Sequence, residues 1–239
     1  MMKLFAIPVL TVLAATAAEQ PALTGFPFTN ETLRYSVSAP GGVRLGQVQL
    51  GSQKSASGWG FTMSVDGGLA GFDVKDNYFA HSNTDFCSVD LTREFRHGAK
   101  TGGEKEEIDR SHASATRTTT ATKGGGKSQF SVPDCTKDAL TFLYYARREL
   151  GQGRVAPAQQ ILFGGFYDVS LQYTGPDTLQ LGEKPVITDK VVVGFKGPAS
   201  ELQFEVWFAR DAARTPLRFQ IPLVKDNPSL GNIALELVR

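Results

Sequence analysis

Apolar and polar residues alternate one by one through most of the chain, and this pattern constrains the fold more than any other feature. Six segments show it most clearly: 33–37, 59–65, 169–173, 202–208, 217–223 and 233–237. Such alternation predicts strands that bury one face and expose the other, which is typical of antiparallel sheets. Clusters of glycine, proline and aspartate separate the segments and indicate turns. We therefore predict a mainly β fold whose antiparallel strands curl into a barrel-like or two-sheet shell.

One amphipathic helix is predicted over residues 134–150, packed against this shell. Asp134 follows a proline and is the predicted N-cap, and Gly151 supplies the stop. One apolar stripe at helical spacing supports the helix. It consists of Ala139, Phe142, Leu143, Ala146 and Leu150.

The first 18 residues have the layout of a secretory signal peptide. A short positive start at Lys3 precedes an apolar stretch from Leu4 to Ala15, and small residues close it. A transmembrane anchor would need about 20 apolar residues, which this stretch lacks. We expect cleavage after Ala17 or Ala18, leaving a single β domain over 19–239 in the periplasm or outside the cell. No later apolar run is long enough to span a membrane.

Two cysteines, Cys87 and Cys135, lie 48 positions apart (135 − 87). In an oxidising compartment an even number of cysteines favours a disulfide. The alternative is two separately buried thiols. A bridge would tie the start of the predicted helix to the strand near Cys87.

The segment 98–129 is polar, and we expect it to form an exposed hairpin or a mobile loop. Its carboxylates are interpreted as a solvated hairpin face, although a paired-carboxylate glycosidase needs only spatial proximity. They are Glu104, Glu106, Glu107 and Asp109. The run 124–128, GGGKS, lacks the first glycine of a phosphate-binding loop and is interpreted as a hairpin tip.

No catalytic, metal or cofactor motif is visible in the sequence. His81, His97 and His112 stand at no ligand spacing, so we predict no metal site. No G-x-S-x-G elbow indicates a hydrolase triad. The formal net charge of +1 argues against nucleic-acid binding.

Two groups of residues have a structural interpretation and, as an alternative, a ligand-binding one. In the hairpin 207–218, Asp211 is predicted to cap the turn and to pair with Arg214 or Arg218, or else these groups grip an anionic or sugar ligand. Aromatic residues at strand spacing are predicted to form core on the inward face, although an apolar ligand could instead lie between the helix and the sheet, next to Tyr144 and Tyr145. These aromatic residues are Trp59, Phe61, Phe204 and Phe208.

Three stretches together resemble a known family. Residues 138–147, DALTFLYYAR, resemble the helix signature of the uncharacterised bacterial exported family called domain of unknown function 3108. Residues 33–46 look like its first hairpin, and residues 207–216 look like its late hairpin. The resemblance implies a wrapped antiparallel sheet with one helix in the bacterial periplasm. It implies no enzyme activity and supplies no catalytic residue.

The sequence therefore predicts a non-catalytic protein of the cell envelope, without a cofactor. Its expected role is to bind or help assemble a lipid, a polysaccharide or an envelope protein. The alternative is a hydrolase of envelope glycans, which would need titratable groups that converge near aromatic residues in a cleft.

Overall fold

The computed structural model describes residues 30–69, 71–121, 124–198, 201–223 and 231–238. The predicted signal peptide, residues 1–18, lies outside these residues, so its prediction stands on the sequence alone. Among the described residues, no helix is long and apolar enough to cross a membrane.

Fifteen strands form one continuous sheet, in the order β8-β7-β6-β5-β4-β3-β2-β1-β15-β14-β13-β12-β11-β10-β9. Neighbouring strands are antiparallel, except that β9 and β10 are parallel. The first eight strands are β1 (Glu31–Ser38), β2 (Arg44–Lys54), β3 (Gly58–Leu69), β4 (Phe72–Asn83), β5 (Ser88–His97), β6 (Lys100–Asp109), β7 (Ser114–Ala121) and β8 (Gly126–Ser131). After β9 (Lys137–Asp138) and the helix α1 (Ala139–Gly151) follow β10 (Gln159–Leu162), β11 (Phe166–Leu181), β12 (Lys184–Lys196), β13 (Glu201–Ala209), β14 (Pro216–Pro222) and β15 (Asn232–Leu237). Two short 3-10 turns, η1 (Pro40–Gly42) and η2 (Arg110–His112), lie in loops.

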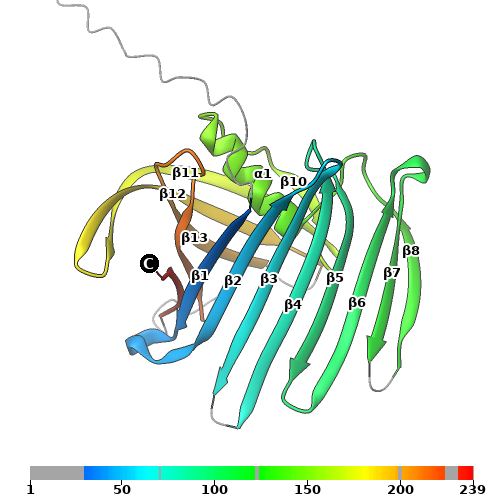
Figure 1. Ribbon diagram of the computed structural model, residues 1–239, viewed down its shortest axis with the longest axis horizontal. Helices are drawn as coiled ribbons and strands as arrows, with labels where there is room; N and C mark the ends of the chain where they lie inside the picture. Colours follow the sequence, from blue (N-terminus) through cyan, green and yellow to red (C-terminus); the bar gives the residue numbers. More distant parts are fainter. Residues whose placement is uncertain (1–29, 70, 122–123, 199–200, 224–230, 239) are drawn as a thin grey trace, which may run out of the picture.

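The sheet curves so that its two halves, β1–β8 and β9–β15, lie on either side of α1 (Figure 1). One side of the helix packs on the second half: Phe142, Ala146 and Leu150 join a core cluster with residues of β10 to β13. The other side packs on the first half through Leu140 and Tyr144. We call the face of the sheet that contacts α1 the inner face, and the opposite face the outer face.

The prediction of a mainly β fold with one helix is confirmed, but the predicted barrel-like or two-sheet shell is not, because the strands form one sheet that is not closed into a barrel. The edge strands β8 and β9 do not pair with each other, so the sheet stays open. Alternation predicts which face of each strand is buried, whereas closure requires two edge strands of matching length. Here β9 is only two residues long and leads directly into α1.

The helix begins later than predicted, because Asp138 and not Asp134 is its N-cap. The Asp138 carboxylate accepts hydrogen bonds from the backbone N–H groups of Leu140 and Thr141, at 2.8 and 2.9 Å. Cys135 has a φ of +56°, a left-handed conformation that ends any helix started at Asp134. Asp134 instead lies exposed and pairs with Arg110 at 3.1 Å.

The polar segment 98–129 forms β6, β7 and the start of β8, which pair as antiparallel hairpins, so the structure agrees with the predicted hairpin and not with the mobile loop. Threonine residues favour extended backbone, and cross-strand pairs of opposite charge replace apolar pairs on the inner face. Low hydrophobicity alone therefore left the choice between hairpin and loop open.

The aromatic residues predicted as core do lie in the core. Trp59 and Phe61 belong to the cluster beside β3 and β4, Phe208 belongs to the cluster with β10 to β13, and Phe204 is half-buried against the latter. The Phe61 ring stacks on Tyr144 with ring centroids 4.3 Å apart. Side chains of the helix and the sheet thus contact each other directly where an apolar ligand was considered.

Candidate functional site

The inner face continues beyond α1 as a band of half-buried apolar side chains. Cross-strand partners on one face lie beside each other, and the register pairs Phe204 with Val193, Phe219 with Leu235, and Leu50 with Met63. We define the apolar band as the partly exposed members of these rows: Val37, Met63, Val65, Leu171, Phe204, Phe219 and Leu235. In a fully packed core such side chains would lose their remaining contact with water, so the band is an apolar surface open to solvent.

The inner face becomes polar at β4, where the rows of cross-strand partners end in charged side chains. Met63 pairs with Tyr78, Tyr78 with Arg93, and Arg93 with Glu104. We define the charged cluster as Asp76, Arg93, His97, Glu104 and Arg117. The apolar band and the charged cluster therefore lie on neighbouring rows of the inner face, with the buried Tyr78 between them.

The charged cluster consists of two groups of ion pairs. Asp76 accepts a hydrogen bond from Arg93 at 3.0 Å and lies 2.8 Å from Nε2 of His97. Arg117 donates two hydrogen bonds to Glu104, at 2.7 and 2.8 Å, and this contact raises the pKa of Arg117. The surface presents hydrogen-bond donors and acceptors of both signs with little excess charge, which suits a polar or zwitterionic group better than a strongly charged one.

Glu106 is the most unusual residue next to this cluster. It is 1% exposed, and its Oε1 accepts a hydrogen bond from the Gly164 backbone N–H at 3.0 Å. Its Oε2 is buried and has no hydrogen-bond partner among the described residues. Burial, together with the negative charge of Glu104, raises the pKa of Glu106 to about 7.

A small cavity of about 30 Å³ lies beside Glu106, lined among others by Tyr78, Arg93 and Phe163. Burial raises the pKa of Tyr78 to about 12. The volume is roughly that of one water molecule in the liquid. A sugar ring therefore has no room next to the Glu106 carboxyl group.

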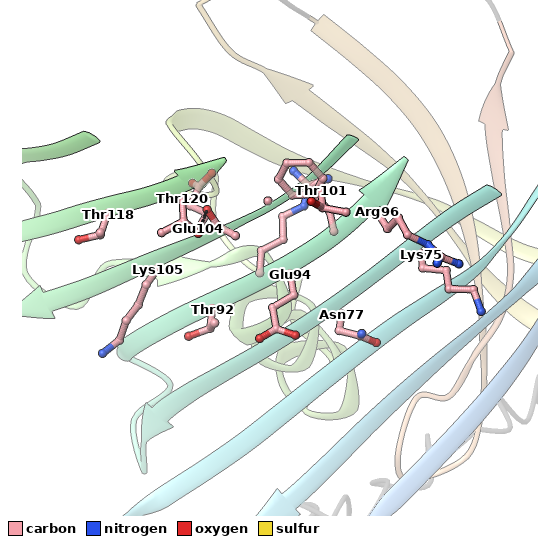
Figure 2. A pocket seen from close by; sticks show the side chains of 14 residues that line it. Lys75, Asn77, Thr92, Glu94, Arg96, Thr101, Glu104, Lys105, Thr118 and Thr120 are labelled. Carbon is pink, nitrogen blue, oxygen red and sulfur yellow. Dashed lines mark hydrogen bonds between the residues drawn. The ribbon is translucent and has the colours of Figure 1, made fainter. Parts of the chain in front are cut away.

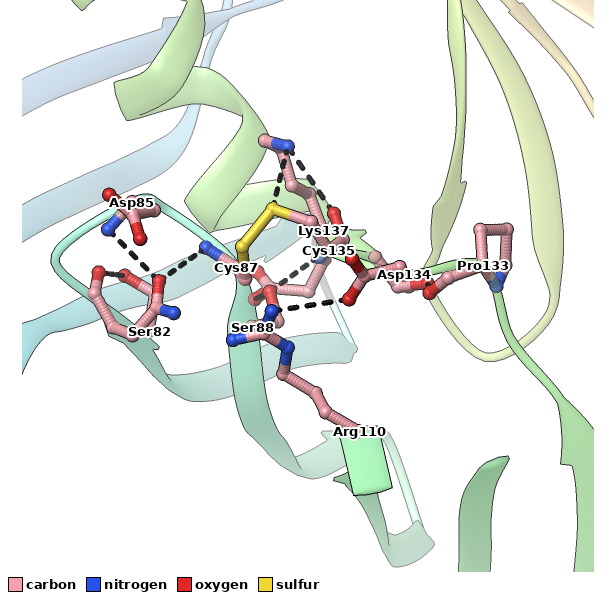
Figure 3. Close-up of a disulfide and its surroundings, with 12 residues drawn as sticks. Ser82, Asp85, Cys87, Ser88, Arg110, Pro133, Asp134, Cys135 and Lys137 are labelled. Carbon is pink, nitrogen blue, oxygen red and sulfur yellow. Dashed lines mark hydrogen bonds and ion pairs between the residues drawn. A yellow bond between two sulfur atoms is a disulfide. The ribbon is translucent and has the colours of Figure 1, made fainter. Parts of the chain in front are cut away.

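The predicted disulfide is confirmed: Cys87 and Cys135 are bonded, with their Cα atoms 4.4 Å apart (Figure 3). Next to it, the Ser88 Oγ donates a hydrogen bond to Asp138 Oδ2 at 2.5 Å and accepts one from the Asp138 backbone N–H at 2.8 Å. The bridge and Ser88 together fasten the start of α1 to the start of β5. Lys137 lies 3.6 Å from the Cys135 sulfur, and burial lowers the pKa of this lysine.

The three histidines lie far apart, and each has an aspartate partner. His81 pairs with Asp90 at 2.8 Å, and His112 with Asp109 at 2.7 Å. Hydrogen bonds from Ser111 and His112 lower the pKa of Asp109 to about 2. No group of three or more metal-ligating side chains occurs in the part of the chain that the structure describes.

The arginines of the 207–218 hairpin pair outside it, contrary to the prediction. Asp211 caps the turn through Thr215, whose backbone N–H and hydroxyl group donate to it at 2.9 and 2.7 Å. Arg214 bonds Asp189 of β12 at 2.5 Å, and Arg218 pairs with Glu236 of β15. The pairing partners come from neighbouring strands that are distant in sequence, so local reasoning could not find them.

Sequence reasoning also missed the charged cluster and Glu106. The carboxylates at 104–109 divide between two faces: Glu107 is exposed and bonds Lys105, whereas Glu104 and Glu106 face inward. One signal was present, because Ile108 follows Glu106 at strand spacing and marks the buried face.

Comparisons with known proteins agree with the family resemblance. No curated protein and no solved structure matched the chain. The family model described as a protein of unknown function, DUF3108, matches residues 34–227, which is 194 of the 239 residues (227 − 34 + 1). The match covers β2 to β14, most of β1 and all of α1, and it ends before β15. The chain therefore belongs to the DUF3108 family of proteins of unknown function.

Proposed function

We propose that the protein is a non-catalytic protein of the cell envelope that binds an amphiphile on its inner face. The acyl chain would lie on the apolar band, and the polar group would meet the charged cluster. The observation that carries this proposal is that the two groups lie next to each other on one sheet face, in the rows Met63–Tyr78–Arg93 and Val65–Asp76. An apolar surface with a few convergent polar groups at one end is typical of sites for such ligands.

Export to the periplasm or beyond belongs to the same proposal. It is supported by the signal-peptide layout of residues 1–18 and by the Cys87–Cys135 disulfide. Structural disulfides persist in oxidising compartments and are rare in the cytoplasm.

Hydrolysis of glycans is the weaker alternative. Of the two inward carboxylates, Glu104 is held by two hydrogen bonds from Arg117, and Glu106 borders a cavity with room for about one water molecule. Neither group has the space beside it that a scissile glycosidic bond and its attacking water require.

The experiment compares ligand capture by two variants with that of the wild type. Met63 lies in the apolar band, whereas Thr62 is exposed on the outer face of the same strand. Native mass spectrometry of protein purified from the periplasm should find a lipid bound to the wild type and to Thr62→Lys. Met63→Lys should lose it, because a lysine would place a charge in the path of the acyl chain.

Thermal unfolding of both variants separates lost binding from lost folding. Uptake of a fluorescent fatty acid by the wild type provides a second readout. A ligand-free wild-type protein that takes up no fatty acid would contradict the proposal, and so would equal binding by Met63→Lys.

A further inference from the structure

The outer face of the first half carries two hollows that join into one groove. The larger, of about 760 Å³, lies over β4 to β7, and the smaller, of about 320 Å³, lies over β1 to β4. Lys75 and Asn77 line both. With strands about 4.8 Å apart, the six steps from β1 to β7 span roughly 29 Å across the sheet.

A missing side chain deepens the middle of the larger hollow. Gly103 lies between Glu94 and Thr120 in the register, and all three line the hollow. A Cβ atom at position 103 would lie 2.9 Å from the Thr120 Oγ1. The backbone here is ordinary extended strand, so the turn geometry that often requires glycine does not explain this residue. The close approach of the Thr120 hydroxyl group accounts for it.

Most of the side chains that line the groove carry a hydroxyl, amide or charged group. Thr92 and Glu94 project from β5, Asn77 from β4, and Thr118 from β7 (Figure 2). The smaller hollow adds further amides and hydroxyls: Gln47, Gln49 and Ser64. This lining lacks the large buried anchors of most protein interfaces.

Most cations of the groove have an acid nearby: Arg96 lies 3.9 Å from Asp73, whereas Arg34 bonds the Gln49 amide at 3.2 Å. Lys75 lies 3.4 Å from Asp66, and Lys105 lies 2.7 Å from Glu107. A surface that binds a polyanion usually shows a basic excess, and this groove has no such excess. The chemistry therefore fits an uncharged or weakly charged chain rich in hydroxyl groups.

Phe79 supplies an apolar platform at the side of the groove. It follows Asn77 at strand spacing, pairs with Thr92, and is 47% exposed. About half of this ring is open to solvent, and the C–H face of a sugar ring can stack on it.

We infer that this groove, defined by the outer faces of β1 to β7, binds a polysaccharide chain that crosses the strands. The site is separate from the inner face, so it does not depend on the proposed amphiphile binding. Met63→Lys should leave glycan binding unchanged, and the failure of one proposal would leave the other standing.

The test uses the full-length mature protein on an array of neutral and acidic bacterial polysaccharides. Calorimetry then follows with the hexasaccharide and the disaccharide of a bound glycan. We expect binding to a neutral polysaccharide, and an affinity for the hexasaccharide at least tenfold above that for the disaccharide, because the groove is elongated. Binding should change little between low and high salt, since no phosphate-like charges are neutralised.

Two threonines of β7 provide a matched pair of variants. Thr118 lines the groove, whereas Thr116 lies on the same face of the same strand outside it. Thr118→Ala should weaken binding roughly 3- to 10-fold, the worth of one hydrogen bond, and Thr116→Ala should not. Gly103→Gln, which fills the depression, should weaken it more than tenfold.

Thermal unfolding confirms that each variant is folded. Absence of binding to every glycan on the array would overturn the inference. Binding that survives both Thr118→Ala and Gly103→Gln in folded protein would overturn it as well, because the glycan would then lie elsewhere.

Discussion

The Gly164 backbone N–H donates a hydrogen bond of 3.0 Å to Glu106 Oε1, and this contact joins the two halves of the sheet. Gly164 lies in the turn between β10 and β11, and Glu106 lies in β6. The φ of Gly164 is +68°, and a Cβ atom there would lie 3.1 Å from Glu104 Oε1. Only glycine fits this position without strain. Side-chain contacts of this kind hold the halves together where no strand ladder closes the sheet.

Replacement of Glu106 by glutamine should change how stability depends on pH. The pKa of Glu106 is raised from 4.5 to about 7, so the native state binds more protons than the unfolded state between these values. The free energy of unfolding of the wild type should therefore fall as pH rises through this window, by on the order of 3 kcal/mol from this group. Glu106→Gln cannot ionise, keeps an acceptor for Gly164, and should lack this part of the decline.

Urea unfolding at pH 5 and pH 7.5 measures this difference. Glu107→Gln is the control, because Glu107 is exposed on the other face of the same strand. Parallel pH profiles for the wild type and Glu106→Gln would show that the carboxyl group is not buried as described.

The strands of the fold could be predicted from the sequence because each carries its own alternation. The two cysteines were also paired correctly, since only one pairing exists. Closure of the sheet could not be predicted, because it depends on whether β8 and β9 meet in space. The N-cap was misplaced for a related reason: both Asp134 and Asp138 suit a cap, and the disulfide and the conformation of Cys135 decide between them.

The inner charged cluster was invisible in the sequence for a different reason. Glu104 and Arg117 become partners only when β6 and β7 pair, and Glu106 becomes buried only when Gly164 of the second half reaches it. A polar segment is interpreted as solvent-exposed when its tertiary contacts are unknown. The charged cluster is therefore set by tertiary contacts, which the composition of the segment could not indicate.

Truncation of the true N-cap should destabilise the protein far more than truncation of the predicted one. Asp138 accepts hydrogen bonds from Leu140, Thr141 and Ser88, and its removal leaves buried donors without partners. Asp138→Ala should lower the free energy of unfolding by roughly 2–4 kcal/mol. Asp134→Ala removes only an exposed ion pair and should cost about 0.5 kcal/mol or less. Equal losses in chemical denaturation would contradict the assignment of the cap.

Reduction of the disulfide should destabilise the protein without unfolding it in native buffer. Cys87 and Cys135 close a loop of 48 positions, for which the chain-entropy model gives roughly 4 kcal/mol. Ser88 and Asp138 still connect β5 to α1 after reduction. Labelling should find no free thiol before reduction and two afterwards, and the melting temperature should fall. Two labelled thiols in untreated protein from the periplasm would refute the bridge.

Arg147 and Glu31 should behave as a strongly coupled pair. The Arg147 side chain is 0% exposed, and it donates to Glu31 at 2.7 and 2.8 Å. Its Nε lies 3.1 Å from the carbonyl oxygen of Ala213, so the guanidinium group joins α1, β1 and the β13–β14 loop. Glu31→Ala leaves this cation without its carboxylate and should cost roughly 3–5 kcal/mol.

A double-mutant cycle distinguishes this coupling from a general loss of packing. Arg147→Met alone leaves the Glu31 carboxylate without its cation, and Glu31→Met alone leaves the Arg147 cation without its carboxylate. The double variant Arg147→Met with Glu31→Met replaces both charges by apolar groups of similar volume. Because a paired removal leaves no uncompensated buried charge, the double variant should be more stable than the sum of the two single losses predicts, by more than about 1 kcal/mol. Urea unfolding of the four proteins gives the coupling free energy. Additive losses would mean that the two side chains stabilise the fold independently, and the ion pair would then not be what fastens α1 to the first strand.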